Sequence, residues 1–145
     1  MRHLLDVNAL LALLDPAHVF HEAAHRWLDR EPEALWLTCP LVQNGALRVA
    51  AQTTYPNRLG SCAEVRKVLA EFCADARHAF CADDLSLLDD PALIRPEKLT
   101  PSRVTDLYLL LLARRHGALL TTFDSRIPAD AVRDGKKHLK ILSTL

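Results

Sequence analysis

The sequence contains little glycine, few aromatic residues and no excess of charge of either sign. Only 4 of the 145 residues are glycine, 6% are aromatic, and 18 Lys and Arg balance 18 Asp and Glu. Together with 28 Leu and 20 Ala, this composition argues against disordered sequence and favours helices packed on a core. The zero net charge argues against a strongly basic nucleic-acid-binding protein, although a balanced total can conceal a dipolar distribution.

Motifs typical of several other protein classes are absent. The chain has no G-x-S-x-G for a serine hydrolase and no glycine-rich phosphate loop. No apolar run approaches the roughly 18 residues of a membrane span, and the opening residues do not resemble a signal peptide. The cysteines lack C-x-x-C spacing and are predicted to be reduced thiols of a cytoplasmic protein: Cys39, Cys62, Cys73 and Cys81.

The chain has the length of one compact domain, predicted over residues 1–145. Short apolar segments are predicted to be strands: His3–Leu5, Leu35–Leu37, His78–Cys81, Ala118–Thr121 and His138–Leu142. Helices are predicted over Val7–Leu14, His21–Arg30, Leu41–Ala51, a segment after Ser61 and Arg103–His116. The alternation, with no hairpin turns, predicts an α/β sandwich in which helices cover both faces of a parallel sheet.

The ends of two helices carry recognisable capping signals. Ser61 and Glu64 match a capping box at the start of one helix. For the last long helix, Thr100 or Ser102 is expected to be the N-cap, and Gly117 is expected to end it in the left-handed conformation.

Three acidic residues are predicted to meet at one edge of the sheet. Asp6 follows the first strand, Asp124 follows the strand Ala118–Thr121, and Asp106 lies in the first turns of the preceding helix. Singly, each has an ordinary structural interpretation as a cap, a first-turn acid or an Asx turn. Jointly they favour a Mg²⁺ or Mn²⁺ site, because converging carboxylates repel one another unless a cation neutralises them. Metal-assisted attack of water on a phosphodiester is the chemistry expected there.

Four segments carry a resemblance to a known family: Leu4–Asn8, Pro40–Val49, Thr105–Asp106 with Ala113, and Thr121–Asp124. In order and spacing they resemble the motifs of PIN-domain ribonucleases, most closely the VapC-type toxins of bacterial toxin-antitoxin pairs. The resemblance implies a three-layer α/β/α sandwich with a short, mostly parallel five-stranded sheet. It also implies a Mg²⁺- or Mn²⁺-dependent endoribonuclease toxin that cleaves RNA, forms a homodimer and is neutralised by a VapB-like antitoxin.

Carried over to this sequence, the resemblance makes Asp6, Asp106 and Asp124 the metal-binding carboxylates and Asn8 a supporting residue. Gln43 becomes a fourth catalytic residue, at a position where the family usually has Glu. An amide lacks the negative charge and should bind a metal ion more weakly. A natural Gln-bearing branch, an engineered attenuated enzyme and a domain with little activity all stay open, and the alternative function is a PIN-fold binding module.

A second metal-binding motif competes with this interpretation. His21-Glu22-Ala23-Ala24-His25 matches H-E-x-x-H, in which two His ligands bind zinc. The extended protease form needs Gly and His where this chain has Leu28 and Glu31. A partly exposed helix face is therefore favoured over a zinc protease, and adventitious zinc binding is left open.

The net charge of zero is the sum of an acidic and a basic part of the chain. Residues 1–98 contain 10 Lys and Arg against 14 Asp and Glu, a net of −4, whereas residues 99–145 contain 8 against 4, a net of +4. The basic side chains of the final third are candidates for contact with RNA phosphates near Asp106 and Asp124. With two Trp and two Tyr, the chain offers few stacking platforms, so the RNA target is not predicted.

Overall fold

A computed structural model describes residues 1–145 and contains one five-stranded sheet. The strands are β1 (Arg2–Leu5), β2 (Leu35–Thr38), β3 (His78–Phe80), β4 (Leu119–Thr122) and β5 (Leu139–Ile141). Their order is β3-β2-β1-β4-β5, and every neighbouring pair is parallel. The predicted α/β class is therefore confirmed, with a sheet that is parallel throughout.

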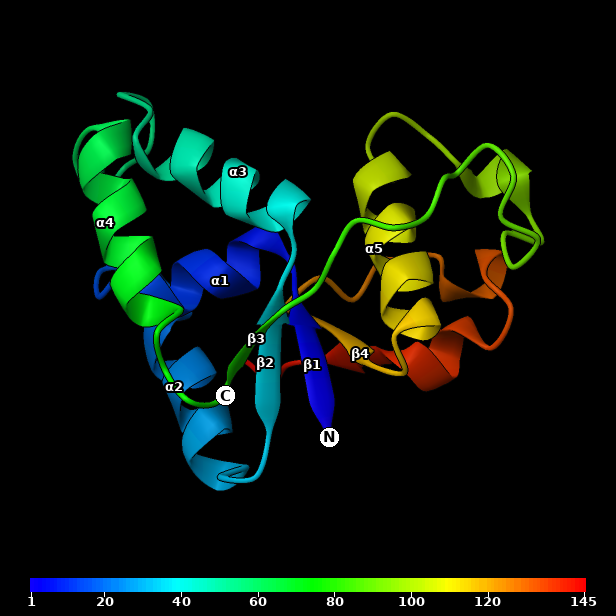
Figure 1. Ribbon diagram of the computed structural model, residues 1–145, viewed down its shortest axis with the longest axis horizontal. Coiled ribbons are helices and arrows are strands. Elements are labelled where there is room, and N and C mark those ends of the chain that lie inside the picture. The colour runs from blue at the N-terminus through cyan, green and yellow to red at the C-terminus, as the bar shows by residue number, and fades with distance from the viewer.

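Helices cover both faces of this sheet. They are α1 (Val7–Leu14), α2 (His21–Arg30), α3 (Pro40–Ala50), α4 (Cys62–Phe72) and α5 (Val104–Arg115), with the short 3-10 helices η1 (Pro96–Lys98), η2 (Ala129–Ala131) and η3 (Gly135–His138). Figure 1 shows α1 to α4 on one side of the strands and α5 on the other. This is the predicted three-layer arrangement. None of these helices is long and apolar enough to span a membrane.

The core lies where β1, the central strand, meets both helical layers. Leu4 and Leu5 of β1 are fully buried, since each faces one of the two layers. On α5 the run Leu109–Leu112 is almost completely buried, and residues at successive positions of a helix point in different directions. Contacts from β1, β4, η2 and η3 cover the faces of α5, which explains why it is apolar nearly all round.

The start of α5 differs from the prediction, whereas its end agrees with it. Neither Thr100 nor Ser102 caps the helix: its N-cap is Arg103, and the two hydroxyls lie 3.3 Å from each other instead. At the other end Gly117 has a φ of 62°, and the Ala118 N–H donates to the Ala113 carbonyl at 2.8 Å. This bond closes a Schellman turn, which requires a residue that tolerates the left-handed conformation.

Candidate active site

One pocket at the carboxyl edge of the sheet contains all three predicted acids. Asp6 enters it from the end of β1, Asp124 from the segment after β4, and Asp106 from the first turn of α5. The pocket has a volume of about 250 Å³, and its other lining residues are Val7, Asn8, Thr105, Leu109 and Thr122. Because β1 and β4 are adjacent and parallel, the residues that follow them are brought together at one edge.

Asp6 is the most buried of the three acids, with 9% of its surface exposed. One carboxylate oxygen accepts the Ala9 N–H at 2.8 Å and so caps α1, and the other accepts the Thr122 hydroxyl at 2.5 Å. Burial raises the pKa of Asp6, and the charges of Asp106 and Asp124 act in the same direction. Asp6 therefore combines the predicted capping role with a place in the pocket.

Asp106 and Asp124 share one arginine. Nη1 of Arg103 lies 3.0 Å from Asp106 Oδ2 and 2.9 Å from Asp124 Oδ2, and Nε of Arg126 donates to Asp124 Oδ1 at 3.1 Å. Partial burial opposes ionisation of Asp124, yet the bonds from Arg126 and Arg103 lower its pKa to about 2. Burial raises the pKa of Asp106 even though Arg103 stabilises its charged form.

The donor chemistry of this pocket fits a hard divalent cation. It offers carboxylate oxygens from three separate elements, and a guanidinium already sits between two of them as a cation. With the side chains in these positions, no group of three His, Cys, Asp or Glu residues closes around a metal position. Asp6, Asp106 and Asp124 remain the residues suited to hold such an ion, once the bonds to Arg103 are exchanged.

Arg103 lies next to the pocket and is one of the basic residues expected near Asp106 and Asp124, but its bonds to both of these acids were not predicted. The available signal was its spacing, because an Arg three positions before an Asp places both side chains on one helix face. That spacing is common in surface helices and carries no information about Asp124, which is 21 residues away.

Gln43 lies apart from the three acids. Its side-chain amide donates to Thr38 Oγ1 at 2.9 Å, and the same hydroxyl lies 2.8 Å from His78 Nε2. Gln43 is not among the residues that line the carboxylate pocket. In this structure it belongs to a separate polar group with Thr38, the last residue of β2, and His78, the first residue of β3.

Asn8 lines the pocket, as expected of a supporting residue, and contacts a residue that the sequence did not indicate. Its side-chain oxygen lies 2.9 Å from His18 Nε2, in the loop between α1 and α2. No signal in the sequence links these two positions, because their contact depends on the path of that loop.

The two histidines of the H-E-x-x-H motif have backbone partners. His21 Nδ1 lies 2.7 Å from the Ala12 carbonyl and His25 Nε2 lies 2.9 Å from the Leu13 carbonyl. Both carbonyls belong to the last turn of α1, where unpaired carbonyl groups need donors. No third His, Cys, Asp or Glu joins the pair to complete a metal-binding group. The favoured interpretation as a helix face thus agrees with these contacts.

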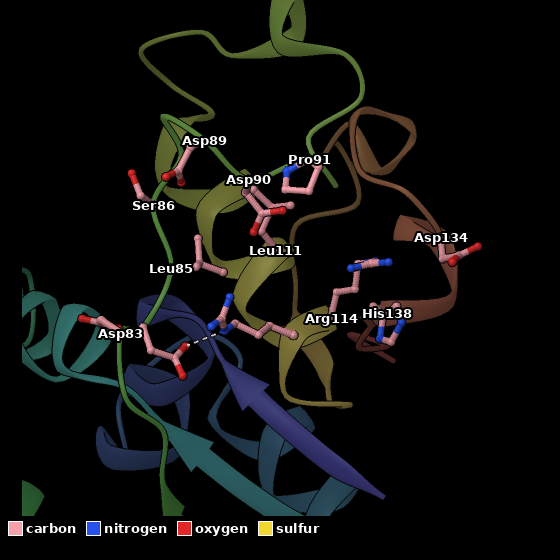
Figure 2. Close-up of a pocket in the computed structure, with 12 residues that line it drawn as sticks. Asp83, Leu85, Ser86, Asp89, Asp90, Pro91, Leu111, Arg114, Asp134 and His138 are labelled. Carbon is pink, nitrogen blue, oxygen red and sulfur yellow. Dashed lines mark ion pairs between the residues drawn. The ribbon is translucent and has the colours of Figure 1, made fainter.

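A larger cavity, of about 910 Å³, lies away from the carboxylate pocket. Figure 2 shows aspartates of the loop after β3 on one side of it, Asp134 and His138 on the other, and Arg114 of α5 between them. Arg115 also lines it and forms an ion pair with Asp84 at 3.3 Å. Two of the basic residues expected near the acids therefore face this cavity instead, and Arg103 and Arg126 are the ones that touch the acids.

The family model of the PIN domain matches residues 3–132 of the chain. The chain belongs to the PIN-domain family. Ribonuclease VapC44 of Mycobacterium tuberculosis strain H37Rv is 42% identical over 143 residues, which cover 98% of this chain and 100% of the relative. Ribonuclease VapC38 of the same strain is 38% identical over 143 residues, covering 98% and 99%, and Ribonuclease VapC39 is 36% identical over 135 residues, covering 93% and 96%.

These similarities confirm the predicted family and its VapC branch. The matched part of the PIN domain contains all three pocket acids and Gln43. The strand β5, at Leu139–Ile141, lies beyond it and completes the same sheet by pairing with β4.

Proposed function

We propose that this PIN domain is a metal-dependent endoribonuclease toxin of the VapC type. The observation that carries the proposal is the pocket in which Asp6, Asp106 and Asp124 meet at the carboxyl edge of the sheet. Similarity over nearly the whole chain to proteins named ribonucleases supports RNA as the substrate. The Arg103 and Arg126 guanidinium groups beside the acids supply the positive charge that an RNA phosphate needs.

Asp6, Asp106 and Asp124 would hold Mg²⁺ or Mn²⁺, with Gln43 as a weakened fourth member of the catalytic set. When bound, such an ion supplies an activated water and stabilises the charge that develops on the phosphate. Thr122 holds Asp6 in place through its hydroxyl. Arg103, released from the carboxylates, and the exposed Arg126 bind the phosphate from the rim of the pocket. Cleavage of the P–O3′ bond leaves products with a 5′-phosphate.

The alternative function is a catalytically weak PIN-fold module that binds antitoxin or RNA. Two observations favour it. Arg103 neutralises two of the three acids from within the chain, and Gln43 adds no negative charge and lies outside the pocket. A module of this kind has no need for a divalent cation, so metal dependence separates the two functions.

We further propose that residues 1–145 act as a single PIN domain in the cytoplasm, as a homodimer neutralised by a VapB-like antitoxin. The four free cysteines are consistent with a reducing compartment. Leu41 of α3 and Val68 of α4 are exposed by 37% and 41%. Exposed apolar side chains on these two helices are suitable contacts for a partner chain.

The test is cleavage of RNA by the purified protein in Mg²⁺ or Mn²⁺ and in EDTA. The wild type is expected to cleave only with metal and to yield 5′-phosphate ends. Asp6→Asn is expected to reduce the rate by at least ~100-fold, because it removes a metal-binding charge while its amide oxygen can still cap α1. Equal rates for the wild type and Asp6→Asn would refute the proposal.

A further inference from the structure

The loop between α1 and α2 places His18 against the candidate active site in one defined tautomer. The backbone N–H of Phe20 donates to His18 Nδ1 at 3.0 Å. A backbone N–H can only donate, so Nδ1 is the acceptor nitrogen and the proton of the neutral ring lies on Nε2. Burial lowers the pKa of His18, which favours this neutral form.

The tautomer of His18 fixes the orientation of the Asn8 amide. The protonated Nε2 lies 2.9 Å from Asn8, so the amide atom that faces it must be the oxygen. The amide nitrogen, with its two N–H groups, then points away from His18 and has no hydrogen-bond partner within the chain. Asn8 also lines the pocket that contains the three acids. The groups that Asn8 leaves without a partner are therefore its two N–H donors, and an N–H donor binds an anion and not a metal ion.

The loop that carries His18 is anchored on both sides. At its start, the buried carboxylate of Asp15 accepts the Ala17 N–H at 3.0 Å and the Tyr55 hydroxyl at 2.6 Å. At its end, the ring of Phe20 stacks on that of Phe123, next to Asp124, with the centroids 4.6 Å apart. These contacts hold His18 in place before any ligand binds. Little conformational entropy is therefore lost when Asn8 binds a ligand.

We propose that His18 is a positioning residue that turns the amide donors of Asn8 toward a non-bridging phosphate oxygen of bound RNA. The inference rests on the proposed function of the pocket and assigns Asn8 to the substrate and not to the metal. A free amide N–H pair beside a site for a phosphodiester provides hydrogen-bond donors that its acids cannot.

The first test is made on the free protein, without metal or RNA. Nitrogen NMR of the wild type is expected to show His18 protonated on Nε2 and one sharp pair of Asn8 side-chain amide signals. His18→Ala should shift and broaden that pair, whereas His18→Gln should preserve it, because its amide nitrogen can donate from nearly the same place. Val19→Ala is the matched control, since Val19 lies in the same loop with 83% of its surface exposed. A His18 ring protonated on Nδ1 would overturn the proposal. So would Asn8 signals that are the same in His18→Ala and the wild type.

The second test measures the affinity for a single-stranded RNA by fluorescence anisotropy in EDTA, where cleavage is stopped. Asn8→Ala and His18→Ala should each weaken RNA binding by about 3- to 10-fold. The double variant should bind no more weakly than either single variant, because both act through the same contact. His18→Gln should bind RNA as tightly as the wild type. An unchanged affinity of Asn8→Ala would refute the phosphate contact. If the wild type proved unable to cleave RNA with metal, the proposed activity would fail while these affinities and NMR signals still decided the role of His18.

Discussion

Asp6 serves the fold and the pocket with different oxygens. One caps α1 through the Ala9 N–H and the other accepts the Thr122 hydroxyl, while the charge of the group faces Asp106 and Asp124. Replacing Asp6 by Asn removes the charge and keeps an oxygen for the cap. The variant therefore removes the charge from the pocket while the cap of α1 is kept.

Gln43→Glu is expected to increase the rate of RNA cleavage at limiting Mg²⁺ by about 3- to 30-fold, because it adds a negative charge near the carboxyl edge of the sheet. The new carboxylate can accept the Thr38 hydroxyl in place of the bond that Gln43 donates. Gln52→Glu is the matched control, since Gln52 is exposed just beyond α3. A rate no higher than that of the control would show that position 43 does not act on the metal.

Tyr55→Phe is expected to lower the free energy of unfolding by about 1.5 to 3 kcal/mol at pH 7, because the Tyr55 hydroxyl bonds the charged, buried Asp15. Although burial opposes ionisation, the bonds from Tyr55, Ala17 and Asn57 lower the pKa of Asp15. The carboxylate thus contributes stability above its unfolded pKa, near 4, and loses it as the pH falls through the lower folded value.

The effect of Tyr55→Phe should therefore shrink in acid, which urea unfolding at pH 7 and pH 3 measures. Tyr108→Phe is a control, because Tyr108 is a partly buried tyrosine with no hydrogen bond to a carboxylate. A loss for Tyr55→Phe that is the same at both pH values would contradict the assigned bond to an ionised Asp15.

The residues that could be predicted are those whose place follows from the ends of strands and helices. Asp6 comes directly after β1 and Asp124 two residues after the adjacent parallel strand β4, so their meeting follows from topology. The contact of Arg103 with Asp124 and the contact of His18 with Asn8 could not be predicted, because both depend on the path of irregular segments. The partner of Gln43, which is the Thr38 hydroxyl, could not be predicted either, because a long, flexible side chain can reach several neighbouring groups.

At the scale of elements, α1 and α3 are in close contact next to the pocket. Gly45 of α3 lies against Val7 of α1, between the pocket residues Asp6 and Asn8. A Cβ atom at position 45 would lie 2.6 Å from Val7 Cγ2, closer than two carbons can approach. The two helices can cross at this distance only because position 45 has no side chain.

Gly45→Ala is expected to lower the free energy of unfolding by about 1 to 3 kcal/mol, because the β-branched Val7 cannot turn its methyl group away without strain. It should also slow RNA cleavage through the shift of the neighbouring Asp6. Thermal unfolding and the cleavage rate measure the two effects. Adding Val7→Ala removes the contacted methyl and should recover part of the loss; a double variant no better than the sum of the singles would contradict this account.

Helix boundaries could be predicted where spacing and breakers agree. α1 and α2 have the predicted bounds, and both bonds of the predicted capping box are present at Ser61 and Glu64. The start of α5 could not be predicted in detail, because three residues with capping or first-turn preferences stand side by side before it. The side chains of Thr100 and Ser102 bond each other, which leaves the helix to begin after Arg103.

At the scale of the whole molecule, the basic final third is divided between two places. Arg126 stands at the carboxylate pocket, whereas Arg115 is paired with Asp84 at the larger cavity. The balanced total charge therefore does not oppose RNA binding. A few basic side chains beside the acids are enough to bind a phosphate locally.

Arg126→Ala is expected to weaken RNA binding, because in the proposed function Arg126, which pairs with Asp124 at the pocket, binds an RNA phosphate. The variant should release about one fewer counterion, so the salt dependence of binding should fall accordingly. Arg115→Ala, which removes the same charge at the other cavity, is the matched control. Anisotropy titrations across a range of salt concentrations compare them. Equal losses for both variants would indicate a diffuse electrostatic effect in place of a contact at the pocket.

The central claim is that Asp6, Asp106 and Asp124 form a divalent cation site, and calorimetric titration with Mn²⁺ tests it most directly. The wild type is expected to bind with a dissociation constant of about 1 mM or tighter. Asp106→Asn is expected to lose that binding, and Asp130→Asn, at an exposed acid outside the pocket, to retain it. A wild type that binds no Mn²⁺, or an Asp106→Asn variant that binds it equally well, would contradict the account.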